Sequence, residues 1–193
     1  MIISASRRTD IPAFYSTWFM NRVRAGYCGV PNPYNPAQVS FVSLRREDVD
    51  VIAFWTRDPR PMIPNLVELD ERGLRSYFMV TLLNYPPPID LGSPSLGRSL
   101  NTLEKLSGQT GPDRVIWRYD PILLTEATPA EFHLQNFEIL ARSLRGMTRR
   151  VILSFYSPYA KADGRMDELA EMGAALIEPA GPKQAWFGDL LRG

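Results

Sequence analysis

The chain has 193 residues and is poor in metal-binding and disulfide-forming side chains, with one cysteine, Cys28, and one histidine, His133. One cysteine excludes an intrachain disulfide, a Cys₄ or Cys₂His₂ zinc site and a self-contained iron–sulfur cluster. One histidine excludes the HExxH motif and the two-His facial triad. We therefore expect no metal site, and the chemistry must rest on Arg, Asp, Tyr, Asn, Lys and the backbone.

Long hydrophobic runs and strong net charge are also missing. No stretch approaches the ~20 apolar residues of a membrane helix, and the first residues have the wrong pattern for a signal peptide. We therefore expect a cytoplasmic protein with no membrane partner. The net charge of +1 argues against nucleic acid as a partner, and no Gly-rich phosphate loop is present.

Short apolar runs alternate with helical patterns along the chain. The runs cover residues 2–6, 51–56, 76–83, 114–119 and 150–156, and several are continuous, which is typical of strands covered on both faces. Helical patterns over residues 14–25, 64–72, 96–106, 128–144 and 163–172 follow them, and residues 174–177 start a possible sixth strand. Repeated strand–helix units predict an α/β fold with a parallel sheet.

A complete (β/α)₈ barrel takes about 250 residues, more than this chain offers. We therefore predict a single domain over residues 1–193, a partial TIM-like (β/α) barrel with five to six parallel strands, cut short at its C-terminal side. Residues 27–44 interrupt the first unit and predict an inserted β-hairpin arm. An open sheet edge favours pairing with the missing C-terminal segment or with another copy of the chain.

The candidate site lies where the strands end, because ligands bind beyond the carboxyl ends of parallel strands. An Arg/Asp pair follows three of the runs. Because side chains alternate along a strand, Arg8 and Asp10 are expected to share one face of their strand, and Arg118 and Asp120 one face of theirs. The substrate-binding candidates are Arg7, Arg8, Asp10, Trp55, Arg57, Asp58, Asn84, Trp117, Arg118, Asp120, Tyr156 and Lys161.

Three interpretations of these residues stay open. An Arg-lined mouth with aromatic walls from Trp55, Trp117, Tyr119 and Tyr156 suits a small anionic or nucleotide-like ligand. The same pairs also suit ion pairing that ties strand ends together. A third interpretation is a carboxylate-based hydrolase, in which Asp10, Asp58 and Asp120 supply the acid and the nucleophile.

The remaining reactive groups favour plain roles. Lys161 suits a Schiff-base lysine but fits a solvated loop lysine better. His133 lies inside an amphipathic helical pattern, which is typical of a surface or core histidine. Cys28, in the arm, is expected to be an inert thiol.

Four segments, in order, carry a resemblance to a known family. They read ISASRRTDIPAFY over residues 3–15, NPYNP over 32–36, FWTRDP over 54–59 and VIWRYDPI over 115–122. Together they resemble the bacterial domain of unknown function 1848 family, from Met1 to about Lys161.

The resemblance implies a partial barrel similar to radical S-adenosylmethionine enzymes, with an iron–sulfur cluster and S-adenosylmethionine held near the C-terminal end of longer relatives. It places six residues beside cluster and substrate: Arg8, Asp10, Trp55, Arg57, Arg118 and Asp120. This chain lacks the terminal cysteines. We therefore expect it to be the substrate-side fragment, inactive without the missing iron–sulfur segment.

Overall fold

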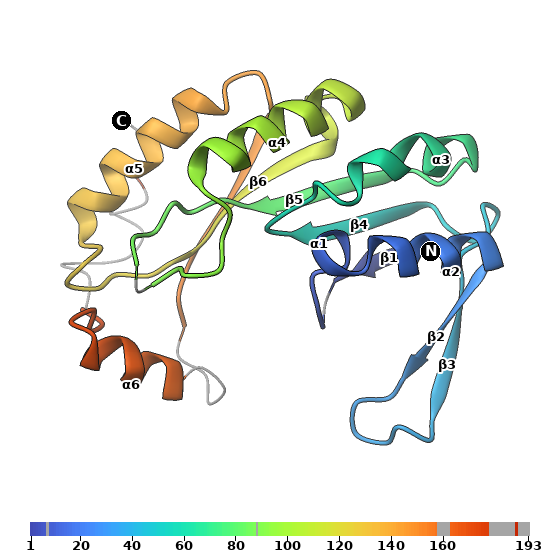
Figure 1. The fold of residues 1–193 in the computed structure, drawn as a ribbon, viewed down its shortest axis with the longest axis horizontal. Helices are drawn as coiled ribbons and strands as arrows, with labels where there is room; N and C mark the ends of the chain where they lie inside the picture. Colours follow the sequence, from blue (N-terminus) through green and yellow to red (C-terminus); the bar gives the residue numbers. More distant parts are fainter. Residues whose placement is uncertain (7, 88, 158–162, 178–187, 189–193) are drawn as a thin grey trace.

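The computed structural model of the chain describes residues 1–6, 8–87, 89–157, 163–177 and 188, and it has a mixed α/β fold (Figure 1). Five strands form a parallel sheet in the order β1-β4-β5-β6-β7. Their bounds are Ile2–Ala5 (β1), Val51–Thr56 (β4), Ser76–Thr81 (β5), Val115–Ile122 (β6) and Arg150–Phe155 (β7). The predicted α/β class and parallel sheet are confirmed.

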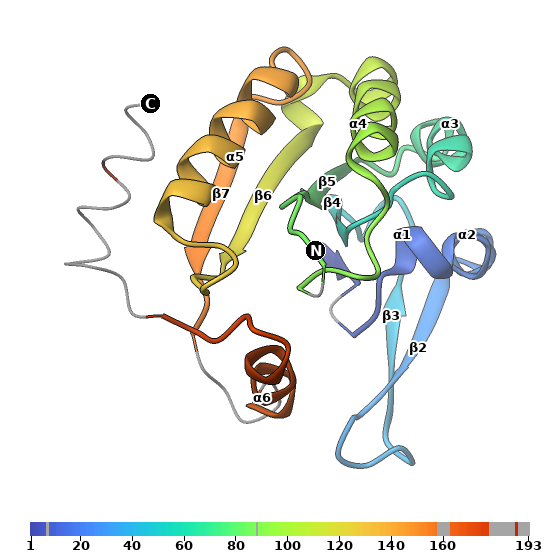
Figure 2. The ribbon, with the colours of Figure 1, turned by 60° about the vertical axis from the view of Figure 1, so that its left-hand side comes forward.

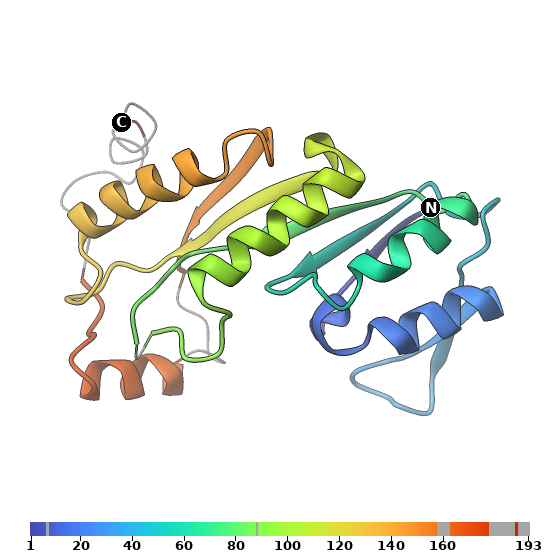
Figure 3. The same ribbon diagram turned by 45° about the horizontal axis from the view of Figure 1, so that its top comes forward.

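Helices connect the strands and cover the outer face of the curved sheet (Figures 2 and 3). They are α1 (Ile11–Phe14), α2 (Ser16–Ala25), α3 (Leu66–Glu71), α4 (Leu96–Thr110), α5 (Ala130–Ser143) and α6 (Asp163–Glu171), with short 3₁₀ turns at Ile63–Asn65 and Pro112–Arg114. Helix α2 ends at Gly26, whose φ of 78° is the left-handed conformation that favours glycine. Helix α6 instead lies beyond the carboxyl ends of β6 and β7 (Figure 2).

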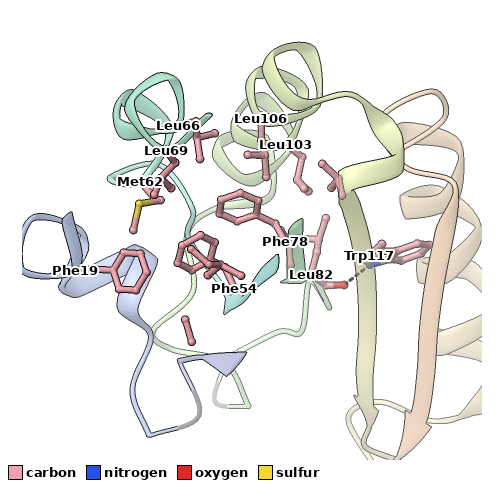
Figure 4. Packing of buried hydrophobic residues seen from close by; sticks show 14 of the residues in the cluster. Phe19, Phe54, Met62, Leu66, Leu69, Phe78, Leu82, Leu103, Leu106 and Trp117 are labelled. Atoms are coloured by element: carbon pink, nitrogen blue, oxygen red, sulfur yellow. Dashed lines mark hydrogen bonds between the residues drawn. The ribbon is translucent and has the colours of Figure 1, made fainter. Parts of the chain in front are cut away.

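The core lies between the sheet and helices α2 to α5 (Figure 4). Phe54 of β4 stacks on Phe78 of β5 with ring centroids 5.0 Å apart, and Phe19 of α2 meets Phe54 edge-on at 5.3 Å. Leucines from α3 and α4 close this cluster from above. On β4, β5 and β6 the outward-facing residues, such as Phe54, Phe78 and Trp117, are thus buried, and the alternate residues are left on the inner face.

The five described strands do not close into a barrel. Residues 174–177, predicted as the start of a sixth strand, instead form an isolated antiparallel bridge between Leu176 and Thr125. The Ile177 N–H donates to the Leu124 carbonyl at 3.0 Å, so this segment pairs with the loop after β6 rather than with the sheet.

The predicted arm over residues 27–44 is confirmed as a hairpin of β2 (Tyr27–Pro31) and β3 (Val39–Ser43). Asparagine side chains shape its tip, since Asn32 Oδ1 accepts from the Tyr34 N–H at 2.9 Å and Asn35 Oδ1 accepts from the Ala37 N–H at 3.3 Å. The arm projects away from the sheet (Figures 1 and 2). Within the described part of the chain, no helix is long and apolar enough to cross a membrane.

Candidate functional site

The strongest polar cluster on the inner face lies at the carboxyl end of β6. Arg118 pairs with Asp120, and its guanidinium lies 4.6 Å from the centre of the Trp55 ring on β4. Ser154 of β7 donates to the other oxygen of Asp120, and Thr81 of β5 lies 3.4 Å from Arg118 Nη1. Four neighbouring strands thus hold one arginine in place, as expected for a charge inside an apolar strand.

Arg57 forms a second arginine–carboxylate pair just beyond β4. Its Nη1 donates to both oxygens of Asp90 at 2.8–2.9 Å and to Ser93 Oγ at 2.8 Å. Among the described residues, Nε and Nη2 of Arg57 donate no hydrogen bond, and the side chain is 47% exposed. Two of its three nitrogens are therefore without a hydrogen-bond partner among the described residues.

Asp10 fixes the backbone at this position. Its Oδ1 accepts from the Ala13 N–H at 3.0 Å and begins helix α1, while its Oδ2 accepts from the Arg57 N–H at 2.7 Å. One carboxylate therefore joins the chain after β1 to the chain after β4. It thereby positions the backbone of Arg57.

Two cavities open at this edge, and Arg57, Tyr85 and Asp90 line both of them. The larger has a volume of about 490 Å³ and reaches from Arg57 to Asp120 and Tyr156, with apolar walls from Met166 and Leu169. The smaller, of about 170 Å³, lies over Asn84 and Ser93. The larger volume falls within the range of small-molecule sites.

A buried polar network supports the loop that carries Asn84. The Tyr119 hydroxyl lies 2.8 Å from His133 Nδ1, and Asn136 Nδ2 donates to Tyr119 and to the Leu83 carbonyl. Asn84 Nδ2 donates in turn to Asn136 Oδ1 at 2.9 Å. Burial lowers the pKa of His133 to about 4 and raises that of Tyr119. The histidine is therefore a neutral core residue, one of its two predicted roles.

Tyr85 holds the turn after β6. Its hydroxyl donates to the Pro121 carbonyl at 2.8 Å and accepts from the Leu123 N–H at 2.9 Å. Burial raises the pKa of this hydroxyl, so it stays protonated and able to donate. Tyr85 is a structural link that also lines the cavities.

Several sequence-predicted residues lie elsewhere. Trp117 is only 3% exposed and stacks on Phe137 of α5, and Tyr119 lies on the same outer face, because both alternate with Arg118 along β6. Neither forms a wall of the mouth. Strand β1 ends at Ala5, so Arg8 and Asp10 do not share a strand face; Arg8 donates to the Pro31 carbonyl of the arm at 2.8 Å.

The three carboxylates proposed for hydrolysis have separate partners. Asp10 accepts from two backbone N–H groups, Asp58 binds Arg60 through both oxygens, and Asp120 binds Arg118 and Ser154. Burial acts to raise the pKa of Asp58, but the hydrogen bonds and charge of Arg60 together hold this pKa below its usual range. Asp58 is thus kept as an anion in an ion pair.

Other candidates lie outside or beside the cluster. Tyr156 and Asn84 line the cavities, as expected for a mouth. Arg7 and Lys161 lie outside the described residues. Sequence reasoning missed Tyr85, Asp90, Ser93 and Ser154. Tyr85 and Ser154 carried a signal, since each lies near the end of an apolar run that predicts a strand.

Comparison with known families matches residues 2–185 to the family described as Domain of unknown function (DUF1848). No curated protein and no solved structure matches the chain significantly.

Proposed function

The chain belongs to the family described as Domain of unknown function (DUF1848), and from that premise we propose that it binds a small anionic molecule at the carboxyl edge of its sheet. One observation carries the proposal: Arg57 lines both cavities and uses only one of its guanidinium nitrogens on the described protein. An exposed arginine with two nitrogens that donate no hydrogen bond to the described residues is suited to a carboxylate or phosphate oxygen pair.

The surroundings of Arg57 favour a compact ligand with an organic part. The larger cavity, of about 490 Å³, combines the Arg57 cation with apolar walls at Ile89, Leu123 and Leu169. Asp120 at its inner end accepts hydrogen bonds and rejects a second anionic group there. A ligand with its anionic group at Arg57 and hydroxyl or amine groups toward Asp120 satisfies both ends.

We also propose that this edge is the substrate-binding side of an enzyme similar to radical S-adenosylmethionine enzymes. The open five-stranded parallel sheet supports this, because it agrees with the partial barrel that the resemblance implies. The residues of this chain do not fit an iron–sulfur cluster, because its only cysteine, Cys28, lies in the arm. The role left for this chain is therefore to hold the substrate, and no reaction step is assigned to a cluster.

The anion-binding part of the proposal is tested by calorimetric titration of the purified chain with pyrophosphate, which probes Arg57 and not the site of the organic part. We expect Arg57→Gln to weaken pyrophosphate binding by about tenfold or more, because a hydrogen bond to a charged group contributes roughly 1.5–3 kcal/mol. Binding should also weaken as salt is raised, since the Arg57 side chain is half-exposed.

Arg60→Gln is the matched control. Arg60 is 45% exposed and pairs with a carboxylate, Asp58, as Arg57 pairs with Asp90, but it lines neither cavity. It should leave pyrophosphate binding unchanged. An equal loss of pyrophosphate affinity in the two variants would show that binding depends on general surface charge and not on Arg57. No binding by the folded wild-type chain would contradict the proposal.

A further inference from the structure

The hairpin arm contains no charged residue, unlike the rest of the chain. Residues 27–43 contain no Asp, Glu, Lys or Arg, although charged residues make up 22% of the chain. Apolar side chains are nevertheless exposed along it, with Tyr27 at 47%, Val39 at 44% and Phe41 at 75%. A two-stranded hairpin is marginally stable alone, and an exposed apolar face on it indicates an interaction surface.

The edge of β3 that faces away from β2 carries backbone groups able to pair with another strand. The Asn32 N–H donates to the Gln38 carbonyl and the Leu44 N–H to the Gly26 carbonyl, so Asn32–Gln38 and Gly26–Leu44 are bonded pairs. Bonded and non-bonded pairs alternate along an antiparallel ladder. The β2–β3 register therefore directs the N–H and C=O groups of three residues outward from the hairpin: Val39, Phe41 and Ser43.

Of the two outer edges of the hairpin, that of β3 is the better suited to pair with another strand. Among the described residues β3 pairs with β2 alone, whereas β2 also packs against α2. Strand β2 also contains Gly29 and ends at Pro31, which has no N–H to donate. Strand β3 reads Val-Ser-Phe-Val-Ser, with β-branched and aromatic residues and no proline.

We propose that the arm is a self-association surface, on which β3 pairs antiparallel with β3 of a second copy of this chain. A two-fold axis beside Phe41 sets Phe41 opposite its own copy and Val39 opposite Ser43. The two hairpins then form one four-stranded sheet with an aromatic face made by Tyr27 and Phe41, whose rings already lie 6.0 Å apart within one arm.

A second copy fits this edge better than a charged partner does. The arm has no charge, so two copies meet without repulsion, and a two-fold axis perpendicular to β3 makes the two identical strands antiparallel. The surface is small: at about 150–250 Å² per aromatic side chain, the exposed parts fall below the roughly 800 Å² per partner of a standard interface. The pairing is therefore weak and reversible.

Cysteine crosslinking tests the pairing directly. In a Cys28→Ser background, Phe41→Cys should form a disulfide-linked dimer in oxidised glutathione, because paired strands bring the two Cα atoms to about 5.5 Å, within disulfide range. Tyr34→Cys in the same background is the control, since Tyr34 lies at the tip and is 96% exposed. Faster crosslinking at residue 41 supports β3 pairing; faster crosslinking at residue 34 overturns it, because random collision favours the more exposed thiol.

Sedimentation velocity of the otherwise unmodified chain gives an independent readout. Over a roughly fiftyfold range of protein concentration the wild type should shift from monomer toward dimer. Phe41→Lys should abolish the shift, whereas Val67→Lys, at an exposed apolar position on α3, should retain it. A wild type that stays monomeric, or a dimer equally lost in both variants, contradicts the proposal. Pyrophosphate binding at Arg57 does not depend on either result.

Discussion

Asp10 joins two strand ends through one carboxylate, and Asp10→Asn separates its two roles. The asparagine keeps an oxygen for the Ala13 N–H and so preserves the start of α1. It replaces the other oxygen with an amide NH₂, which cannot accept from the Arg57 N–H that lies 2.7 Å away in the wild type.

The expected loss follows from these two contacts. A hydrogen bond to a charged acceptor contributes roughly 1.5–3 kcal/mol, and the low end applies because the Arg57 contact is exposed. Asp10→Asn should therefore lower the free energy of unfolding by about 1.5 kcal/mol. Asp10→Ala also removes the helix cap, worth about 1 kcal/mol, and should cost about 2.5 kcal/mol in total.

Urea unfolding followed by circular dichroism measures both values. Asp113→Asn is the control, because both side chains of the Asp113–Arg149 pair are exposed. Its loss should change the free energy of unfolding by no more than about 0.5 kcal/mol. An Asp10→Asn variant as stable as the wild type would refute the assignment of Asp10 as the link between β1 and β4. Equal losses for Asn and Ala would show that the cap contributes nothing.

Two further predictions concern stability. Because the pKa of folded His133 is depressed to about 4, its contribution is complete above the unfolded pKa near 6.5 and is lost as pH falls toward 4. The wild type should lose about 1.4 kcal/mol of unfolding free energy per pH unit in that window, and a His133→Gln variant that keeps the same slope in urea titrations would contradict this. Gly73→Ala should destabilise by about 1 kcal/mol or more, because Gly73 has φ of 72° and an added Cβ would lie 2.6 Å from Arg46 Cδ. In contrast, Gly97→Ala in open space on α4 should stabilise by about 0.5–1 kcal/mol, and thermal melts giving both changes the same sign would refute the argument.

Strand periodicity explains most of what could be predicted from the sequence. The placement of Arg118 and Asp120 together on the inner face follows from alternation, as does the need for partners on neighbouring strands. The same rule places Trp117 on the opposite face, away from the site that it was predicted to line.

The parts that could not be predicted lie in loops. The residues between β5 and α4 have no periodicity, so neither the pairing of Asp90 with Arg57 nor the Tyr85 link to the turn after β6 leaves a sequence signal. Asp10 follows β1 too closely for its helix-capping role to be distinguished from a strand-end role by spacing alone. Tertiary contacts, rather than local patterns, determine these positions.

The most direct measurement of anion binding at the carboxyl edge is a side-chain NMR titration with pyrophosphate. The chain has a second arginine-lined cavity at the amino ends of the strands, of about 850 Å³, bordered by Arg46, Arg75 and Arg150. Binding at Arg57 predicts a shift in the Arg57 Nε–H resonance while the resonances of those three arginines stay unchanged. Shifts confined to Arg46, Arg75 and Arg150 would contradict the account.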